Sequence, residues 1–172
     1  LERRVMLQSS AIVFFPALMA FAACSDLFTM TISNRVSLLL AAGFLIFAAA
    51  LGLPWQTILA HVGAGAGILV LTFAMFSFGW IGGGDAKLAA ATALWIGYDN
   101  LLEYGLYASL LGGALTFVLV VVRRWPLPAT LMRAPWITRL HDEKSGIPYG
   151  IALAAAGALV FPQTQKIGRA HV

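Results

Sequence analysis

The sequence has very few charged residues for its length. Its 11 Lys and Arg and 7 Asp and Glu make up only 10% of 172 residues, against about 25% in soluble domains. So few charges cannot cover a water-facing surface, which excludes a soluble globular enzyme, a disordered tail and a coiled coil. Hydrophobic residues make up 60% of the chain, so we expect an integral membrane protein.

The sequence is also poor in metal-binding and nucleophilic groups. A single cysteine, Cys24, excludes a disulfide framework and a four-Cys zinc site. His61 and His141 have no acidic partners at metal-ligand spacing, and Ser25 has no nearby His, so we predict neither a metal site nor a Ser–His nucleophile. No basic cluster is interleaved with base-stacking aromatics, so the net charge of +4 does not indicate nucleic-acid binding.

Six apolar segments are candidate transmembrane helices. They are residues 11–28, 36–53, 58–80, 86–98, 101–122 and 148–161. The fourth and sixth are short for a full crossing at 1.5 Å per residue, so we expect them either to extend further or to end inside the protein. In the third, Gly63 and Gly67 have the spacing that lets helices approach closely. The pattern predicts an all-α membrane bundle of about six helices, forming one domain over residues 1–172.

Both ends of the chain have unusual sequences. Met6 is the first plausible initiator, and the closing run from Ile167 to Val172 can be back-translated into a common sequencing adapter. We therefore expect residues 1–5 and 167–172 to be non-native and assign them no function. The run that ends at Cys24 loosely resembles a lipoprotein signal peptide, but five further hydrophobic segments follow it.

The distribution of basic residues predicts the orientation in the membrane. With six spans, segments 25–35, 80–87 and 123–147 share one side and carry seven Lys and Arg, whereas the other side carries four. The positive-inside rule places the first set in the cytoplasm and both termini outside. Segment 123–147 contains Trp125 and Trp136 among its Arg residues, as expected where a segment rests on anionic membrane lipid.

Two of the seven acidic residues lie within apolar spans. Asp26 is near the end of the first span, and Asp85 opens the fourth. A carboxylate inside a span costs about 2.5–3.5 kcal/mol and usually marks function. Because the first and third spans end on the same side, both carboxylates reach one membrane face. The structural alternatives are a helix N-cap for Asp85 and a side chain that snorkels to the interface for Asp26.

Neither alternative explains the glycines at Gly82, Gly83 and Gly84, directly before Asp85. Glycine permits close approach and positive φ, and irregular backbone at membrane depth is tolerated only beside an enclosed or watery cavity. A glycine turn that presents one carboxylate opposite another indicates an aspartic-peptidase dyad. Such a pair shares one proton, and it activates water and assists the peptide carbonyl together.

Two polar residues near the pair have a weaker signal. Lys87 is one turn or less from Asp85 and is expected either to orient that carboxylate or to act as a positive-inside anchor. Asn34 is expected either to close the loop after Asp26 or only to mark a helix end.

Three motifs resemble those of type IV prepilin peptidases. Residues 82–88 (GGGDAKL) resemble their Gly-x-Gly-Asp-x-Lys-Leu signature, and residues 25–35 resemble their first motif, an Asp followed by Ile-Pro-Asn. Residues 147–152 (IPYGIA) are similar to the start of their last helix. Ser33 stands where the family often has Pro, whereas Asn34 is retained.

The resemblance implies an intramembrane aspartic endopeptidase of the bacterial inner membrane, without a cofactor. Asp26 and Asp85 would be its catalytic pair, facing the cytoplasm. The substrate would be a prepilin or pseudopilin, cut after a Gly that joins a basic leader to a hydrophobic helix. The length resembles the short form of Flp, or tight-adherence, pilus systems. The methylating members carry paired Cys-x-x-Cys sequences, and with only Cys24 the chain gives methylation no support.

Three other interpretations stay open at the level of sequence. An ion-coupled transporter also uses membrane carboxylates and glycine-broken helices, although here both carboxylates lie toward one face and no inverted repeat is visible. Presenilin-like peptidases share Gly-x-Gly-Asp but carry the first Asp on the preceding helix, whereas here two more spans intervene. A catalytically silent membrane assembly factor is the third.

Overall fold

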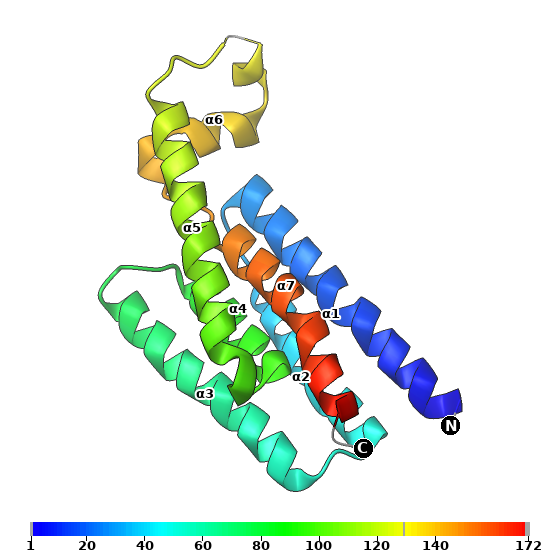
Figure 1. The fold of residues 1–172 in the computed structure, drawn as a ribbon. Helices are drawn as coiled ribbons and strands as arrows, with labels where there is room; N and C mark the ends of the chain where they lie inside the picture. Colours follow the sequence, from blue (N-terminus) through cyan, green and yellow to red (C-terminus); the bar gives the residue numbers. More distant parts are fainter. Residues whose placement is uncertain (1, 129, 171–172) are drawn as a thin grey trace.

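The computed structural model describes residues 2–128 and 130–170, and it is helical without strands over those residues. The α-helices are α1 (Glu2–Thr29), α2 (Asn34–Leu51), α3 (Trp55–Ser77), α4 (Gly83–Ile96), α5 (Leu101–Arg123), α6 (Pro135–His141) and α7 (Tyr149–Ala170). The predicted all-α bundle is confirmed (Figure 1). Of the predicted non-native ends, residues 1, 171 and 172 lie outside the described residues.

Each of the six predicted segments falls on a helix. Within the described part of the chain, four helical stretches are long and apolar enough to cross a membrane, namely Arg4–Thr29, Asn34–Leu51, Trp55–Ser77 and Tyr98–Arg123. The apolar part of α7 is shorter and covers Tyr149–Thr164. The 14 residues of α4 extend about 21 Å, which is less than the roughly 30 Å of a bilayer's hydrocarbon core. The chain is thus a multi-pass membrane protein. The sixth segment extends further than predicted, because α7 continues as a helix to Ala170.

The short helix α4 lies at the centre of the bundle. It packs against α2, α3 and α7, and it is buried at Ala86 and at every position from Leu88 to Ile96. A helix covered by protein need not match the bilayer in length. Of the two expectations for the fourth segment, the second is correct, because α4 ends inside the protein.

Aromatic packing fixes the end of α4 that is remote from Asp85. Ring centroids of Phe15, Phe44 and Phe161 lie 5.4, 6.0 and 5.9 Å from that of Trp95, within the range of favourable aromatic pairs. The indole Nε1–H of Trp95 donates a 2.8 Å hydrogen bond to the carbonyl oxygen of Leu40. Helices α1, α2, α4 and α7 therefore share one core, from which the N-terminal turn of α4 extends toward the other end.

The close approach of α3 to α4 occurs at a different glycine from those predicted. A Cβ atom on Gly65 would lie 3.2 Å from the carbonyl oxygen of Ala90, whereas Cβ atoms on Gly63 and Gly67 would meet nothing within 4 Å. Residues four apart share a helix face and residues two apart do not. The prediction for Gly63 and Gly67 is therefore wrong, because their shared face points away from α4.

The basic segment between α5 and α7 folds back onto the bundle. Arg123 donates a 3.0 Å hydrogen bond to the carbonyl oxygen of Leu140, and Arg139 donates one of 3.0 Å to that of Phe28 at the end of α1. The rings of Phe28 and Trp136 meet edge to face at 5.3 Å. This segment, whose residue 129 is not described, includes a short helix, α6, that the sequence analysis did not predict.

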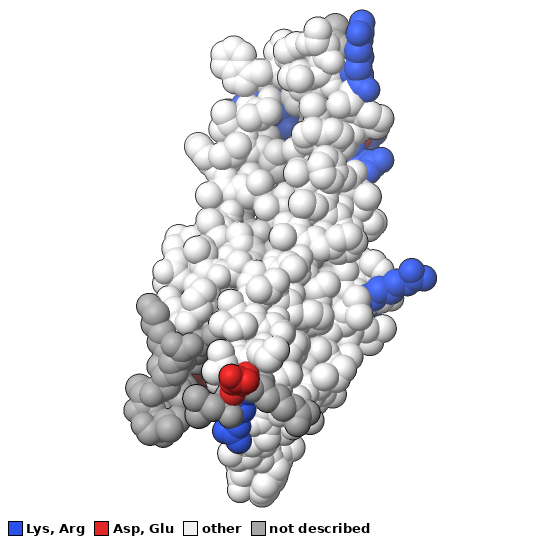
Figure 2. Space-filling model, turned by 90° about the vertical axis from the view of Figure 1, so that its right-hand side faces the viewer, with Lys and Arg blue, Asp and Glu red and all other residues white. Residues whose placement is uncertain are grey.

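The outer surface is strongly apolar, as lipid contact requires. Exposed fractions reach 71% at Val70 on α3, and 87% and 70% at Leu102 and Phe117 on α5. Most of the face in Figure 2 carries no charged side chain.

Candidate active site

Asp26 lies in the last turn of α1 and is almost fully buried, with 4% of its surface exposed. Its Oδ2 accepts a 2.8 Å hydrogen bond from the backbone N–H of Gly150. Gly150 is in the first turn of α7, where backbone N–H groups lack partners within the helix and favour negative charge. The alternative in which Asp26 snorkels to the interface is wrong, because its carboxylate points into the bundle and is held there by α7.

The contact leaves no room for a side chain at position 150. A Cβ atom on Gly150 would lie 2.7 Å from Oδ2 of Asp26 and 2.5 Å from Cδ1 of Ile32. Pro148 directly precedes α7, where its fixed φ suits a helix start and its missing N–H costs no helical hydrogen bond. The Pro-Tyr-Gly run of residues 148–150 thus starts α7 and lets its backbone touch the Asp26 carboxylate.

Asp85 lies on the first turn of α4. The helix begins at Gly83 with Gly82 as its N-cap, so Asp85 is its third residue and the N-cap alternative is wrong. A Cβ atom on Gly82 would lie 3.0 Å from Oδ2 of Asp85, so the carboxylate turns back toward the helix start. The positive end of the helix dipole favours a carboxylate there.

The three glycines before Asp85 pack tightly against neighbouring groups. A Cβ atom on Gly83 would meet the Phe76 ring at 3.3 Å, and one on Gly84 would meet Cβ of Ile32 at 3.2 Å. The expected close approach is present. The expected positive φ is not found at these three glycines but at Gly79, whose φ is 74°.

The loop from α1 to α2 places Ile32 against Gly84 of α4 and Gly150 of α7. Met30 adopts a positive φ of 55°, and Ser25 Oγ donates a 2.9 Å hydrogen bond to the carbonyl oxygen of Thr31. Ser33 is the N-cap of α2, and its Oγ accepts a 3.3 Å hydrogen bond from the N–H of Arg35. The serine at position 33 therefore has a capping role of its own.

Both carboxylates line a single cavity of about 540 Å³. Three loops form its walls, those before α2, before α4 and before α7. Together with Asp26 and Asp85, its lining includes Met30–Ile32, Gly79–Gly84, Ser145–Ile147 and Tyr149. The fold thus brings the two sequence-predicted aspartates to one cavity, where they could act jointly on a bound peptide.

Comparison with known proteins identifies the family. A model of the type IV leader peptidase family matches residues 13–117, a stretch that contains both aspartates. The chain belongs to the type IV leader peptidase family. A search of curated proteins and a search of solved structures give no match. Membership of this leader peptidase family makes the chain a protease with prepilin-like substrates.

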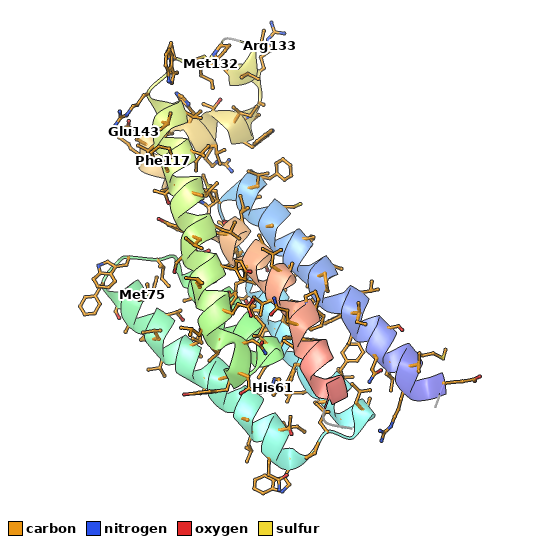
Figure 3. All side chains as sticks on the ribbon, in the orientation of Figure 1. His61, Met75, Phe117, Met132, Arg133 and Glu143 are labelled. Atoms are coloured by element: carbon orange, nitrogen blue, oxygen red, sulfur yellow. The ribbon has the colours of Figure 1, made fainter. Side chains whose placement is uncertain are left out.

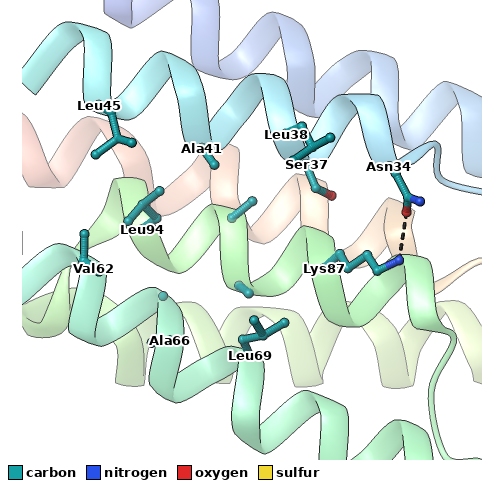
Figure 4. Close-up of a pocket in the computed structure, with 13 residues that line it drawn as sticks. Asn34, Ser37, Leu38, Ala41, Leu45, Val62, Ala66, Leu69, Lys87 and Leu94 are labelled. Atoms are coloured by element: carbon teal, nitrogen blue, oxygen red, sulfur yellow. Dashed lines mark hydrogen bonds between the residues drawn. The ribbon is translucent and has the colours of Figure 1, made fainter.

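In this leader peptidase, Lys87 and Asn34 form a contact with each other. Lys87 Nζ donates a 2.9 Å hydrogen bond to Asn34 Oδ1, which joins the start of α4 to the start of α2 (Figure 4). Both residues line an apolar cavity of about 570 Å³ between α2, α3 and α4, and this cavity shares no lining residue with the aspartate cavity. The geometry therefore indicates that Lys87 holds α4 against α2 and does not act directly on Asp85.

His61 and His141 do not line the aspartate cavity. His61 Nδ1 is hydrogen-bonded to the carbonyl oxygen of Leu94 at 2.8 Å, and its ring stacks on Phe44. Figure 3 shows His61 on α3, at the end of the bundle remote from α6. Among the residues whose side chains are described, no group of three or more His, Cys, Asp or Glu residues could hold a metal ion.

Several residues of the cavity were missed at the level of sequence. Trp80, Ile147 and Tyr149 line it, and the Tyr149 hydroxyl is within hydrogen-bonding distance of Thr116 Oγ1, at 3.1 Å. Aromatic and aliphatic side chains are common throughout a membrane protein, so their residue types carry no signal. Only the glycine turn after Trp80 and the 147–152 motif, which contains Ile147 and Tyr149, could have indicated their position.

Proposed function

We propose that this chain is an intramembrane aspartic endopeptidase that removes the leader of prepilin-like proteins at the cytoplasmic membrane face, with Asp26 and Asp85 as its catalytic pair. The observation that carries the proposal is that these carboxylates, 59 residues apart in sequence, line one cavity at one end of the bundle. Both lie within the stretch that the leader peptidase family model matches.

The chemistry follows from two neighbouring carboxyl groups that share one proton. The ionised carboxylate removes a proton from water, whose oxygen attacks the scissile carbonyl carbon while the protonated carboxyl donates to the carbonyl oxygen. Collapse of the tetrahedral intermediate breaks the C–N bond, and the leaving nitrogen takes a proton from the pair. The products are a leader with a new carboxylate and a mature chain with a new amine. The Gly150 N–H, bonded to Asp26 Oδ2, holds one member in a fixed orientation.

The distribution of basic residues supports the cytoplasmic placement. Arg139 bonds to the end of α1 beside the aspartate cavity, and Arg123 bonds to Gly146, which lines it. Lys87 is the fifth residue of α4 and Arg35 the second residue of α2, at the same end. By the positive-inside rule, the end of a bundle that collects Lys and Arg faces the cytoplasm.

The proposal covers peptidase activity without N-methylation, as in the short forms of Flp-type pilus systems. These 172 residues contain Cys24 as their single cysteine, so they hold no paired Cys-x-x-Cys sequences of the kind that the resemblance links to methylation.

The test is leader removal in membranes. Membranes that contain the chain should shorten a prepilin-like substrate at the Gly before its hydrophobic helix, whereas membranes without it should leave the substrate intact. Membranes with the Asp26→Asn or the Asp85→Asn variant should also leave it intact. Leader removal by either variant at the wild-type rate would contradict the proposed pair.

A further inference from the structure

Three hollows with shared lining residues follow one another from the aspartate cavity along the membrane-spanning part of the bundle. Asp85 lines both the aspartate cavity and a second cavity of about 260 Å³ between α3, α4, α5 and α7. A third hollow of about 680 Å³ lies along α5. Ile81 and Tyr149 line all three. The second and third hollows together are called the α3–α5 groove below.

The groove has apolar walls and small residues along one side. The α3 wall includes Ile68, Leu71 and Met75, and Leu153 of α7 also lines the groove. The α5 side consists mainly of small residues, namely Gly105, Ala108, Ser109, Gly112, Gly113 and Thr116. In membranes, helices approach each other most closely where small residues line the contact.

We infer that the α3–α5 groove binds the apolar helix of the substrate, which unwinds at Ile81 and Tyr149 so that the scissile bond reaches Asp85. The inference rests on the proposed function, because it names the docking site of that enzyme's substrate. At membrane depth a bound peptide must satisfy its own backbone polar groups, so the occupant is helical until it enters the polar aspartate cavity. From Gly105 to Val120 the groove follows α5 for about 22 Å, most of the roughly 30 Å hydrocarbon thickness.

The cavity between α2, α3 and α4, of about 570 Å³, is also apolar, but it does not fit this role. Its lining shares no residue with the aspartate cavity, and it ends at the Lys87–Asn34 hydrogen bond. A helix bound there would reach neither carboxylate. Asp85 lines the α3–α5 groove but not this cavity, which selects the α3–α5 groove.

The first experiment fills the groove at positions where the fold has room. Cβ atoms on Gly105 and Gly113 would meet nothing within 4 Å, so Gly105→Leu and Gly113→Leu should fold and occupy the groove. We expect each to raise KM for a membrane-anchored substrate about tenfold or more, with kcat changed less than twofold. Cleavage of a short water-soluble peptide that contains the scissile bond and lacks the apolar helix should stay at the wild-type rate.

Matched controls separate this effect from general damage. Gly63→Leu also adds a side chain where a Cβ meets nothing within 4 Å, and Ala66→Leu fills the cavity between α2, α3 and α4. Both should keep the wild-type KM. The inference is overturned if Gly105→Leu and Gly113→Leu keep the wild-type KM, which is the result expected if lipid alone occupies the groove. It is also overturned if Ala66→Leu raises KM and the two α5 variants do not.

A second experiment keeps the inference testable without turnover. The background is the Cys24→Ser, Asp26→Asn variant, and single cysteines are placed one at a time along the substrate helix. Ser109→Cys should form a disulfide with the substrate cysteines that recur every three to four residues, on one face of that helix. Gly63→Cys should form none. Equal disulfide formation by both overturns the docking site. Failure of the proposed function gives a different result. The wild-type chain would then cleave no substrate, regardless of which cysteines form disulfides.

Discussion

The backbone N–H of Gly150 and the Oδ2 atom of Asp26 lie 2.8 Å apart and form a hydrogen bond between residues 124 positions apart in sequence. This bond joins the first turn of α7 to the last turn of α1. Because the bond is buried, the orientation of the Asp26 carboxylate depends on where α7 begins and on the absence of a side chain at position 150.

Replacement of Gly150 by Ala should therefore abolish most leader cleavage. The added methyl group would lie 2.7 Å from Asp26 Oδ2 and 2.5 Å from Ile32 Cδ1, so the carboxylate or α7 must shift. Overpacking of this kind costs about 1–3 kcal/mol, and we expect at least a tenfold loss of kcat. Gly63→Ala, which adds the same methyl group in open space, should keep the wild-type rate.

A double variant distinguishes the two clashes at position 150. Ile32→Val removes the Cδ1 atom that a methyl group at position 150 would meet, but leaves the contact with Asp26. The Gly150→Ala, Ile32→Val variant should therefore regain little activity, as measured by the initial rate of leader cleavage. Full recovery would show that the clash with Ile32 alone matters and that Gly150 is not needed for the approach to Asp26.

The hydrogen bond between Lys87 and Asn34 should act as a unit. Lys87→Met and Asn34→Leu each break the link between the starts of α4 and α2, and we expect each to lower kcat by about two- to tenfold. The double variant should be no slower than the slower single variant, because groups in one contact are not additive. If Lys87 instead acted directly on Asp85, Asn34→Leu would keep the wild-type rate.

Loss of the Trp95 indole should reduce stability without altering the catalytic step. Trp95→Phe removes the indole donor to the Leu40 carbonyl, and loss of one such hydrogen bond costs about 0.5–1.5 kcal/mol. Because position 95 is ten residues from Asp85, about 15 Å along the helix, kcat of the folded enzyme should stay within twofold. The measurement is thermal inactivation in detergent, with Trp125→Phe, at a position 72% exposed, as the control that should leave stability unchanged.

Chelators should leave leader cleavage unaffected. In the proposed mechanism the two carboxylates activate water without a metal ion, so preincubation of membranes with EDTA should change the initial rate less than twofold. A metalloprotease assayed in the same buffer supplies the positive control. Loss of activity in EDTA that returns on addition of a divalent metal would contradict the mechanism.

Elements defined by length and hydrophobicity could be predicted from the sequence. The apolar runs locate the helices, and the number of spans between Asp26 and Asp85 places both carboxylates at one end of the bundle. The distinction between Gly65 and its neighbours Gly63 and Gly67 could not be predicted, because it depends on the rotation of α3 about its axis. Spacing alone does not determine which face of a helix meets a neighbour.

The same limit applies to Lys87 and to α6. Lys87 is close to Asp85 in sequence, but the packing of α2 beside α4 directs its ammonium group to Asn34. The 7-residue helix α6 has no long apolar run, and its position depends on tertiary contacts such as the bond from Arg139 to Phe28. The partner of Asp26 was likewise missed because it is a backbone N–H group, which no residue type reveals.

The central claim is that Asp26 and Asp85 form the catalytic pair, and single Asp→Asn substitutions test it most directly. The measurement is the rate of leader removal from a prepilin-like substrate, normalised to the amount of each variant in the membrane, with Asp142→Asn in the exposed loop as the matched control. We predict that Asp26→Asn and Asp85→Asn each accumulate and show no detectable cleavage, while Asp142→Asn cleaves at the wild-type rate. Wild-type cleavage by either the Asp26 or the Asp85 variant would contradict the account.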